Sequence, residues 1–446
     1  MKKSDQEFRV SSLVSLVREG FEHDWKHEEE SCKNIFSHAD CLMSAFAMFS
    51  FKYPSMLQFD KEYDEKVTLQ RNLRAIYHVK AVPSDTRMRE RIDAIETSCL
   101  RKGFSKLFAL LQRREVLKEY RFLDDHYLIS FDGTGFFSSH EVFCDHCCIK
   151  KEGKKGTKRY CHQMMMAAMV HPDKKNVFPF APEAICKADG DKKNDCERNA
   201  TKRWVDHFRR EHPKLKVIAI GDGLSSNAPL IQKFMDNKMS FLLVAKDDDH
   251  KHLFDNVNAA TILNPDLAPL WRQEGPKGII LEYQYMNQTG LNAANDHMKI
   301  NVLIYKELQK DSNGKEKILK KWAFVTDIMI TKSNMKELVR GGRARWKIEN
   351  ETFNTLKNQG YHFEHNYGHG YHCLSNNLAY LMCLAFFVDQ ILFYKNALMI
   401  ALYETRSKRA IFEKVRTVLD ILHVGSMEDI FLIVLNKEGY KIEISP

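Results

Sequence analysis

The sequence lacks any uninterrupted apolar run of the ~18 residues that a membrane-spanning helix needs. The nearest approach, residues 378–393, is interrupted by Asp389 and Gln390 and is typical of a core helix. The first residues, MKKSDQEFRV, lack the apolar centre of a secretory signal. No internal repeat or low-complexity tract is evident. These absences favour a protein that neither crosses a membrane nor is secreted.

The cysteines do not form the pattern of a disulfide framework. There are 11 of them, an odd number, scattered from Cys32 to Cys383. Without a secretion signal, reduced thiols in a cytoplasm are expected rather than disulfides.

The bulk composition is that of a folded protein with a basic surface. A chain of 446 residues is too long for one ordinary compact core, so two or more structural units are expected. The sequence is 44% hydrophobic and 28% charged, as in globular proteins. The net charge of +9 favours a polyanionic partner, although charge alone identifies none.

Residues 1–125 carry helical patterns and few strand signals. A charged amphipathic helix is predicted over 84–95, with Ser84 as a candidate cap. Two interpretations of this region stay open: a DNA-binding helical domain, or a helical cap packed on the main domain.

The pattern changes at residue 126 to alternating strands and helices. The predicted order is three meandering strands, a helix, a strand, a helix and a strand. The strands are expected at 127–132, 140–148, 161–170, 216–222 and 240–245, and the helices at 196–211 and 230–237. This order predicts an α/β fold with a ribonuclease H-like mixed sheet flanked by helices.

The remaining sequence divides into three parts. Residues 246–326 are polar with strand-like pieces, and predict a β-rich insertion. The core is therefore expected to be split into 126–245 and 327–375. Residues 376–446 predict a helical C-terminal region.

Two aspartates occupy equivalent places in this pattern. Asp132 and Asp222 each end an apolar strand directly before a glycine, 90 residues apart (222 − 132). A buried unpaired carboxylate is costly, so a turn-capping role or a metal-ligand role is expected for each. Carboxylates at neighbouring strand ends can share Mg²⁺ or Mn²⁺, which prefer oxygen ligands.

A third acid is expected in a basic helical segment further along the chain. Residues 331–360 contain seven Lys or Arg and three Glu, a local charge of +4 (7 − 3). Glu349 lies on the same predicted helix face as Arg345, four residues earlier. Glu351 is the alternative third acid. The cations expected to hold DNA phosphates are Arg343, Arg345, Lys347 and Lys357.

Three segments together resemble a known enzyme family. FDGTGFFSS, VIAIGDGLSSN and RARWKIENETFNTLK are similar to the DDE transposases of bacterial insertion sequences, in the branch with the Tyr-Arg-Glu-Lys (YREK) signature. Arg345 and Glu349 match that signature's spacing. Gly342 occupies its tyrosine position, and Lys357 follows Glu349 by eight residues instead of seven.

The resemblance implies a metal-dependent enzyme acting on DNA. Asp132, Asp222 and Glu349 would hold two Mg²⁺ or Mn²⁺ ions, and the enzyme would nick an element end and join the 3′-hydroxyl to target DNA. It implies terminal inverted repeats as substrate, a homodimer when both ends are joined, and a bacterial cytoplasm near the nucleoid. A base flipped at the element end could stack on Trp271 or Trp322, although ordinary core or edge packing is favoured for each tryptophan. Two rivals stay open: a nuclease that does not join, and an inactive DNA-binding relic.

A second group of residues has the types that bind zinc. Cys144 and Cys147 form a CxxC pair, and Cys161 and His162 follow after a basic loop at 150–159. Reduced cysteines on a hairpin are favoured over zinc here. Further along, HFEHNYGHGYH at 362–372 holds four histidines, of which His365 and His369 are spaced by four, and is interpreted as a loop near DNA rather than a metal site.

Overall fold

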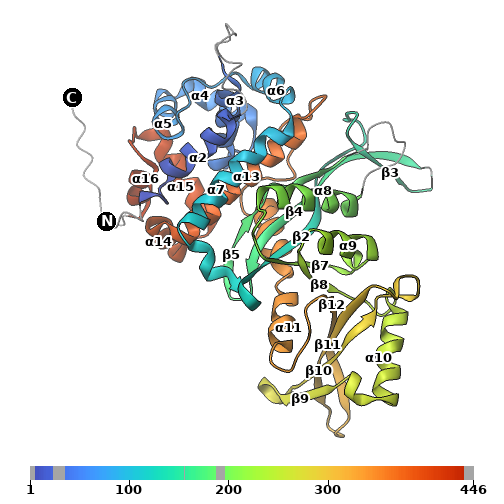
Figure 1. The fold of residues 1–446 in the computed structure, drawn as a ribbon. Helices are drawn as coiled ribbons and strands as arrows, with labels where there is room; N and C mark the ends of the chain where they lie inside the picture. Colours follow the sequence, from blue (N-terminus) through green and yellow to red (C-terminus); the bar gives the residue numbers. More distant parts are fainter. Residues whose placement is uncertain (1–5, 24–35, 155, 187–195, 436–446) are drawn as a thin grey trace.

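The computed structural model describes residues 6–23, 36–154, 156–186 and 196–435. Its centre is one mixed sheet of 12 strands, flanked by helices and joined at one end to a helical body (Figure 1). This arrangement confirms the predicted α/β class with a ribonuclease H-like sheet.

The ribonuclease H-like part of the sheet is built around one long strand. β2 runs antiparallel to β4 on one side and parallel to β7 on the other, and β7 runs parallel to β8. β3, β5 and β6 each pair antiparallel with β4. The strands are β1 (Arg121–Phe122), β2 (His126–Ser139), β3 (Cys148–Glu152), β4 (Thr157–His171), β5 (Lys174–Pro179), β6 (Glu183–Ile185), β7 (Val217–Gly221) and β8 (Ser240–Val244).

Two details of these strands differ from the prediction. β2 does not end at Asp132 but continues through Gly133 to Ser139, because β4 keeps pairing with it after β7 has ended. The strand predicted at 140–148 is wrong: the structure has a turn there and begins β3 at Cys148. The apolar and cysteine residues that suggested a strand lie instead in the turn that leads into β3.

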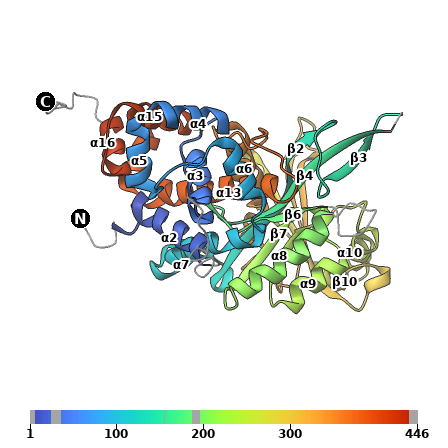
Figure 2. The same cartoon turned by 90° about the horizontal axis from the view of Figure 1, so that it is seen from above.

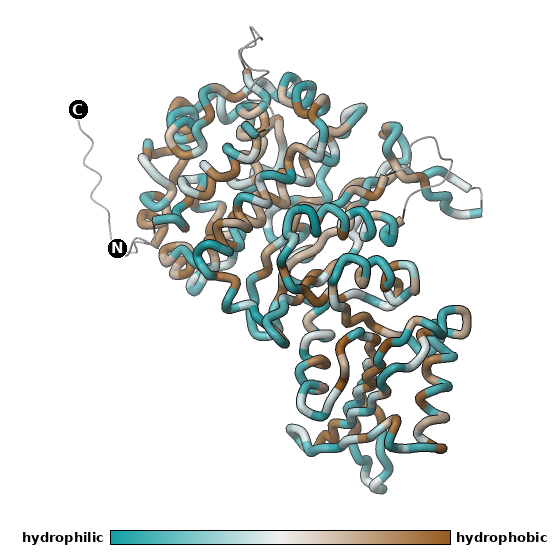
Figure 3. The backbone as a smooth tube through the Cα atoms, in the orientation of Figure 1, coloured by the Kyte–Doolittle hydropathy of each residue, from teal (hydrophilic) through white to brown (hydrophobic). Residues whose placement is uncertain are grey.

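Helices cover both faces of this sheet (Figure 2). α8 (Glu197–Glu211) and α9 (Ala228–Asp236) pack on one face. The other face carries α11 (Met335–Arg343), the π-helical segment η9 (Ile348–Phe353), α12 (Asn354–Asn358) and part of α13 (Leu374–Lys395). The buried residues of α8 include the three that the sequence spaces by four, Ala200, Trp204 and Phe208, while its outer face is hydrophilic (Figure 3).

The predicted insertion extends the same sheet. β12 pairs with β8, with Phe324 opposite Val244, and β11, β10 and β9 follow in order. Its elements are α10 (Lys251–Leu263), β9 (Leu270–Glu274), β10 (Ile280–Gly290), β11 (Lys299–Lys310) and β12 (Glu316–Thr326). Helix α10 was not predicted, because its mixed polar sequence has a weak amphipathic pattern.

The N-terminal and C-terminal helices pack against each other in one body, where blue and red segments intermingle (Figure 1). The N-terminal helices are α2 (Val10–Glu22), α3 (His38–Ser50), α4 (Met56–Glu65), α5 (Val67–Tyr77), α6 (Asp85–Asp93) and α7 (Arg101–Arg113). The C-terminal helices after α13 are α14 (Ala397–Thr405), α15 (Lys408–Ile421) and α16 (Met427–Leu435). Ser84 caps α6 by accepting from the Arg87 N–H, as predicted.

Helix α13 is the core of this body. It is long and apolar enough to cross a membrane, but 94% of its most apolar stretch is buried inside the protein. Its Asp389 pairs with Lys52 of the N-terminal region at 2.6 Å, with side chains 5% and 2% exposed. A helix that is apolar all round and also holds a paired buried charge is a core helix.

Candidate active site and a cysteine–histidine cluster

The pairing of β2 with β7 places Asp132 and Asp222 at the same level. The parallel ladder pairs Tyr127 with Val217 and Ser130 with Ile220, a constant offset of 90 residues. Extended by two residues, the same offset sets Asp132 opposite Asp222. The sequence separation of the two aspartates therefore equals the register of the sheet.

Asp222 directly follows β7, and its side chain caps the helical turn Gly223–Ser225. Its Oδ1 accepts hydrogen bonds from the Leu224 and Ser225 N–H groups, at 3.0 and 3.3 Å. Asp132 is held similarly, because its Oδ1 accepts from the Gly133 N–H at 2.8 Å. One oxygen of each carboxylate is thus fixed by backbone.

Glu349 lies in the helical layer that covers the sheet, and Arg345 links it to Asp132. Nη1 of Arg345 donates to Oε1 of Glu349 at 2.8 Å and lies 3.8 Å from Oδ2 of Asp132. The glutamate lies in η9, whose wider π-helical turn is a feature often found at functional sites. The Ser130 hydroxyl donates to the Arg345 carbonyl oxygen at 3.0 Å and ties this helix to β2.

A fourth acid, Glu197, lies close enough to Asp132 and Asp222 to interact with their charges. It was not assigned to the site from the sequence. A Cβ added to Gly133 would lie 2.5 Å from its Oε2, so the missing side chain at 133 leaves room for this carboxylate. Burial raises the pKa of Glu197 to about 7, and the charges of Asp132 and Asp222 add to the effect. The available signal was an acid in the first turn of an amphipathic helix, which is also an ordinary helix-capping pattern.

The pKa of Asp132 shows how the acids interact. Its pKa is raised to about 6, chiefly by burial and also by the negative charges of Asp222 and Glu349, while the hydrogen bond from Gly133 and the charge of Arg345 oppose the shift. Glu351 instead interacts with Lys347 and Lys408. Of the two acids left open in the helix, the structure brings Glu349 toward the aspartates.

The comparison with known families bears on the same region. Residues 124–387, which are 264 of the 446 residues (387 − 124 + 1), match the family described as Transposase DDE domain. The chain belongs to this family. No curated protein matches the sequence significantly.

The carboxylates of this transposase fit divalent cations by their chemistry. Members of the family generally use divalent metals. Here four acids offer only oxygen donors, and bound cations would offset the burial and the mutual repulsion that raise the pKa of Asp132 and Glu197. In the described part of the chain, only the cysteine–histidine cluster below has three or more ligand atoms within 4.8 Å of one another. The acids stand farther apart, with the Arg345 guanidinium bridging two of them.

The cations of this transposase that were predicted to bind DNA do not form one cluster, and each has different neighbours. Lys347 is half-buried and its Nζ donates to the Lys174 carbonyl oxygen at 2.7 Å, which turns it away from the acids. Arg343 is exposed and lies over Trp322, 4.7 Å from the ring centre. Lys357 lines a groove whose wall includes none of the four acids.

That groove runs along β2 beyond Asp132 and has a volume of ≈ 350 Å³. Three cations line it, Lys150, Arg159 and Lys357, together with Glu364, which pairs with Lys357 at 2.7 Å. Lys150 on β3 pairs with Arg159 on β4 in the arm that these two strands form, and the end of this arm is hydrophilic (Figure 3). The groove can take a phosphate backbone.

The two tryptophans considered for base stacking are already in contact with cations. Lys332 lies 3.8 Å from the Trp271 ring centre, and Trp322 stacks on Tyr305 at 5.6 Å with Arg343 over it. Trp346 is 49% exposed and lies beside Arg345, 4.6 Å from the guanidinium carbon. It lies three residues before Glu349 (349 − 346).

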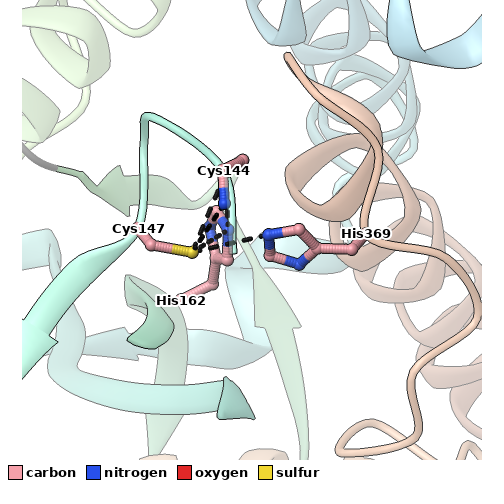
Figure 4. Close-up of side chains that lie close together, drawn as sticks. All are labelled: Cys144, Cys147, His162 and His369. Atoms are coloured by element: carbon pink, nitrogen blue, oxygen red, sulfur yellow. Dashed lines mark hydrogen bonds between the residues drawn. The ribbon is translucent and has the colours of Figure 1, made fainter. Parts of the chain in front are cut away.

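The group considered as an alternative zinc site differs from the observed cluster in one member. Cys144, Cys147 and His162 do come together, but Cys161 points elsewhere and donates to the Cys148 carbonyl oxygen at 3.4 Å. His369 takes the fourth place (Figure 4). Adjacent residues of a strand point to opposite faces, so Cys161 and His162 on β4 could not both face the cluster. The interpretation of the 362–372 loop as free of metal ligands missed this contact.

Proposed function

We propose that this chain is an insertion-sequence transposase whose catalytic acids are Asp132, Asp222 and Glu349. It cuts DNA at the ends of the element and joins the freed 3′-hydroxyl to target DNA. The observation that supports this most is the β2–β7 register, which sets the two aspartates side by side, with Arg345 joining Asp132 to Glu349.

In this proposal the three acids hold two Mg²⁺ or Mn²⁺ ions. Bound cations would stabilise the charge on the attacking and leaving oxygens of the phosphodiester. Arg345 keeps Asp132 and Glu349 together and balances their charge. Glu197 adds a fourth carboxylate that can accept a proton near neutral pH, since burial and its neighbours raise its pKa to about 7.

The DNA contacts follow from the groove beside the acids. Lys150, Arg159 and Lys357 would contact backbone phosphates as the strand leaves the catalytic centre. Arg343 and Trp322 lie on the side of the insertion, where a flipped base could stack, with Trp271 as the alternative. The net charge of +9 supports a nucleic-acid partner.

The finer assignments complete the proposal. The Arg345–Glu349 spacing supports the YREK branch, although Gly342 stands where that branch has tyrosine. The substrate would be double-stranded DNA with terminal inverted repeats, and joining both ends calls for a homodimer. The setting would be a bacterial cytoplasm, at the nucleoid.

The test uses a plasmid that carries the genomic DNA flanking the gene on both sides. Purified protein with Mg²⁺ or Mn²⁺ is incubated with this plasmid and a second, target plasmid. Nicks at inverted repeats followed by joined products support the proposal. Nicks without joining identify the rival nuclease, and specific DNA binding without nicks identifies an inactive relic.

A further inference from the structure

The cysteine–histidine cluster gathers four soft ligand atoms around one point. The sulfurs of Cys144 and Cys147 are 3.8 Å apart. Nε2 of His162 lies 3.4 and 3.3 Å from these two sulfurs, and Nε2 of His369 lies 3.4 Å from the sulfur of Cys147. All four atoms lie within 4.8 Å of one another.

These separations are close to the edges of a tetrahedral zinc site. With Zn–S bonds of about 2.3 Å and Zn–N bonds of about 2.0–2.1 Å, a tetrahedron separates two sulfurs by about 3.8 Å and a sulfur from a nitrogen by about 3.6 Å. The sulfur pair matches, and the sulfur–nitrogen pairs are shorter by a few tenths of an ångström. A disulfide would need a sulfur separation of about 2.05 Å.

The cluster is enclosed rather than scattered over the surface. Cys147, His162 and His369 are buried, and Cys144 is partly buried. Phe137 of β2 packs on the His369 ring at a centroid distance of 4.4 Å. Within the described residues, Nδ1 of either histidine has no hydrogen-bond partner. The two imidazoles are therefore oriented by aromatic packing and by what their Nε2 atoms face, which is the pair of sulfurs.

The four residues come from two parts of the chain that are distant in sequence. Cys144 and Cys147 lie in the turn before β3 and His162 on β4, whereas His369 follows α12 and comes from the other side (Figure 4). His369 is 207 residues after His162 (369 − 162). A metal at this point would join the β3–β4 arm to the segment that follows the proposed catalytic helix.

We propose that Cys144, Cys147, His162 and His369 bind one Zn²⁺ ion in a closed structural site. Four protein ligands leave no open position for substrate, which is the pattern of structural rather than catalytic zinc. The ion fixes the wall of the groove, because the arm supplies Lys150 and Arg159 and the segment before His369 supplies Lys357 and Glu364. Zinc binding itself does not depend on the proposed transposase reaction; the role in shaping the DNA groove does.

The experiment measures zinc bound to the purified full-length chain by elemental mass spectrometry. The wild type is expected to retain about one zinc per chain after gel filtration. His369→Ala should lose most of it, and Cys147→Ser likewise. Two matched controls should keep it: Cys161→Ser, whose thiol bonds to a backbone carbonyl, and His365→Ala, an exposed histidine of the same loop.

A second readout covers the case in which His369→Ala does not fold. Co²⁺ in place of zinc gives visible absorption bands that report tetrahedral geometry and the number of thiolate ligands. The wild type should show two thiolates, and His369→Cys should retain the metal and show three. A His369→Cys spectrum identical to the wild type overturns the assignment of His369.

Other outcomes overturn the site as a whole. Wild-type protein prepared with zinc present that retains none, and that gives no tetrahedral Co²⁺ spectrum, contradicts it. So does absent zinc together with a disulfide between Cys144 and Cys147, seen as an intact mass 2 Da lower under non-reducing conditions and located by peptide mapping. Loss of zinc in Cys161→Ser but not in Cys147→Ser would replace this ligand set with another. Normal DNA cleavage by a zinc-free variant would remove only the groove-shaping role.

Discussion

Asp132 and Asp222 occupy the same level of adjacent parallel strands, because the β2–β7 ladder has an offset of 90 residues and the two aspartates are 90 residues apart. Backbone N–H groups donate to one oxygen of each carboxylate. The other oxygen of Asp132 faces Arg345, which also binds Glu349. The predictions below depend on this arrangement.

Glu349→Gln should abolish DNA nicking, whereas Glu351→Gln should leave it nearly unchanged. The Glu349 carboxylate shares Arg345 with Asp132, while Glu351 interacts with Lys347 and Lys408. Loss of a metal-binding acid is expected to lower the single-turnover rate on the order of 10³-fold or more. A nicking rate that falls for Glu351→Gln and survives in Glu349→Gln would reverse the assignment.

Glu197→Gln should stabilise the metal-free protein at alkaline pH. Burial and neighbouring acids raise the pKa of Glu197 from 4.5 to about 7 in the folded state. A raised pKa means that the stability from this group is present below pH 4.5 and is lost as the pH rises through about 7. The variant cannot ionise, so at pH 8 its free energy of unfolding should exceed that of the wild type by about 1–2 kcal/mol after allowance for solvent screening.

Chemical denaturation with a chelator present measures this difference. The gain should shrink to near zero at pH 4.5, where the wild-type carboxyl is protonated as well. A variant that is less stable than the wild type at pH 8 would show that Glu197 makes favourable contacts as an anion, contrary to the account.

Gly342→Ala should destabilise the fold. A Cβ at this position would lie 2.4 Å from Cε1 of Phe324, a ring 1% exposed in the sheet below α11. Overpacking of a buried ring typically costs about 1–3 kcal/mol. The same contact leaves no room for a larger side chain at position 342.

The matched control is Gly425→Ala, where the nearest atom would be 3.7 Å away, and its unfolding free energy should change by less than about 0.5 kcal/mol. Equal melting temperatures for both variants would mean that α11 can move away from Phe324.

Lys52→Met should destabilise the helical body by about 3–5 kcal/mol, because it leaves the Asp389 carboxylate buried without its ammonium partner. The Tyr361 hydroxyl also donates to Asp389 and would remain as its neutral partner. The double variant Lys52→Met, Asp389→Leu should recover much of the lost stability, since both charges are gone. Thermal unfolding of the single and double variants measures this recovery. A double variant less stable than Lys52→Met would show that Lys52, Asp389 and Tyr361 stabilise the helical body together.

Local patterns in the sequence predicted the elements of the core and their order. The strands around Asp132 and Asp222 were predicted because apolar runs ended at acids, and α8 because Ala200, Trp204 and Phe208 repeat every four residues. The register between β2 and β7 could not be read from either strand alone. The sequence indicated that the two strands are neighbours only through the assumption that acids at equivalent strand positions lie side by side.

What the sequence did not predict depends on contacts between distant segments. The insertion continues the sheet through the pairing of β12 with β8, and the two terminal helical regions share one core around α13. His369 joins Cys144 and Cys147 from more than 220 residues away (369 − 147 = 222). Periodicity within a segment says nothing about which other segment it meets, so these features needed the structure.

The most direct test of the account is localised protein cleavage by bound iron. Fe²⁺ replaces Mg²⁺ in the purified protein, and ascorbate with peroxide generates hydroxyl radicals that cut the polypeptide near the ion. The account predicts three cuts, near residues 132, 222 and 349, that disappear together when Mg²⁺ is added in excess or when Asp132 is changed to Asn. Cuts at only one of these positions, or cuts confined to the cysteine–histidine cluster, would contradict the convergence of the three acids on shared cations.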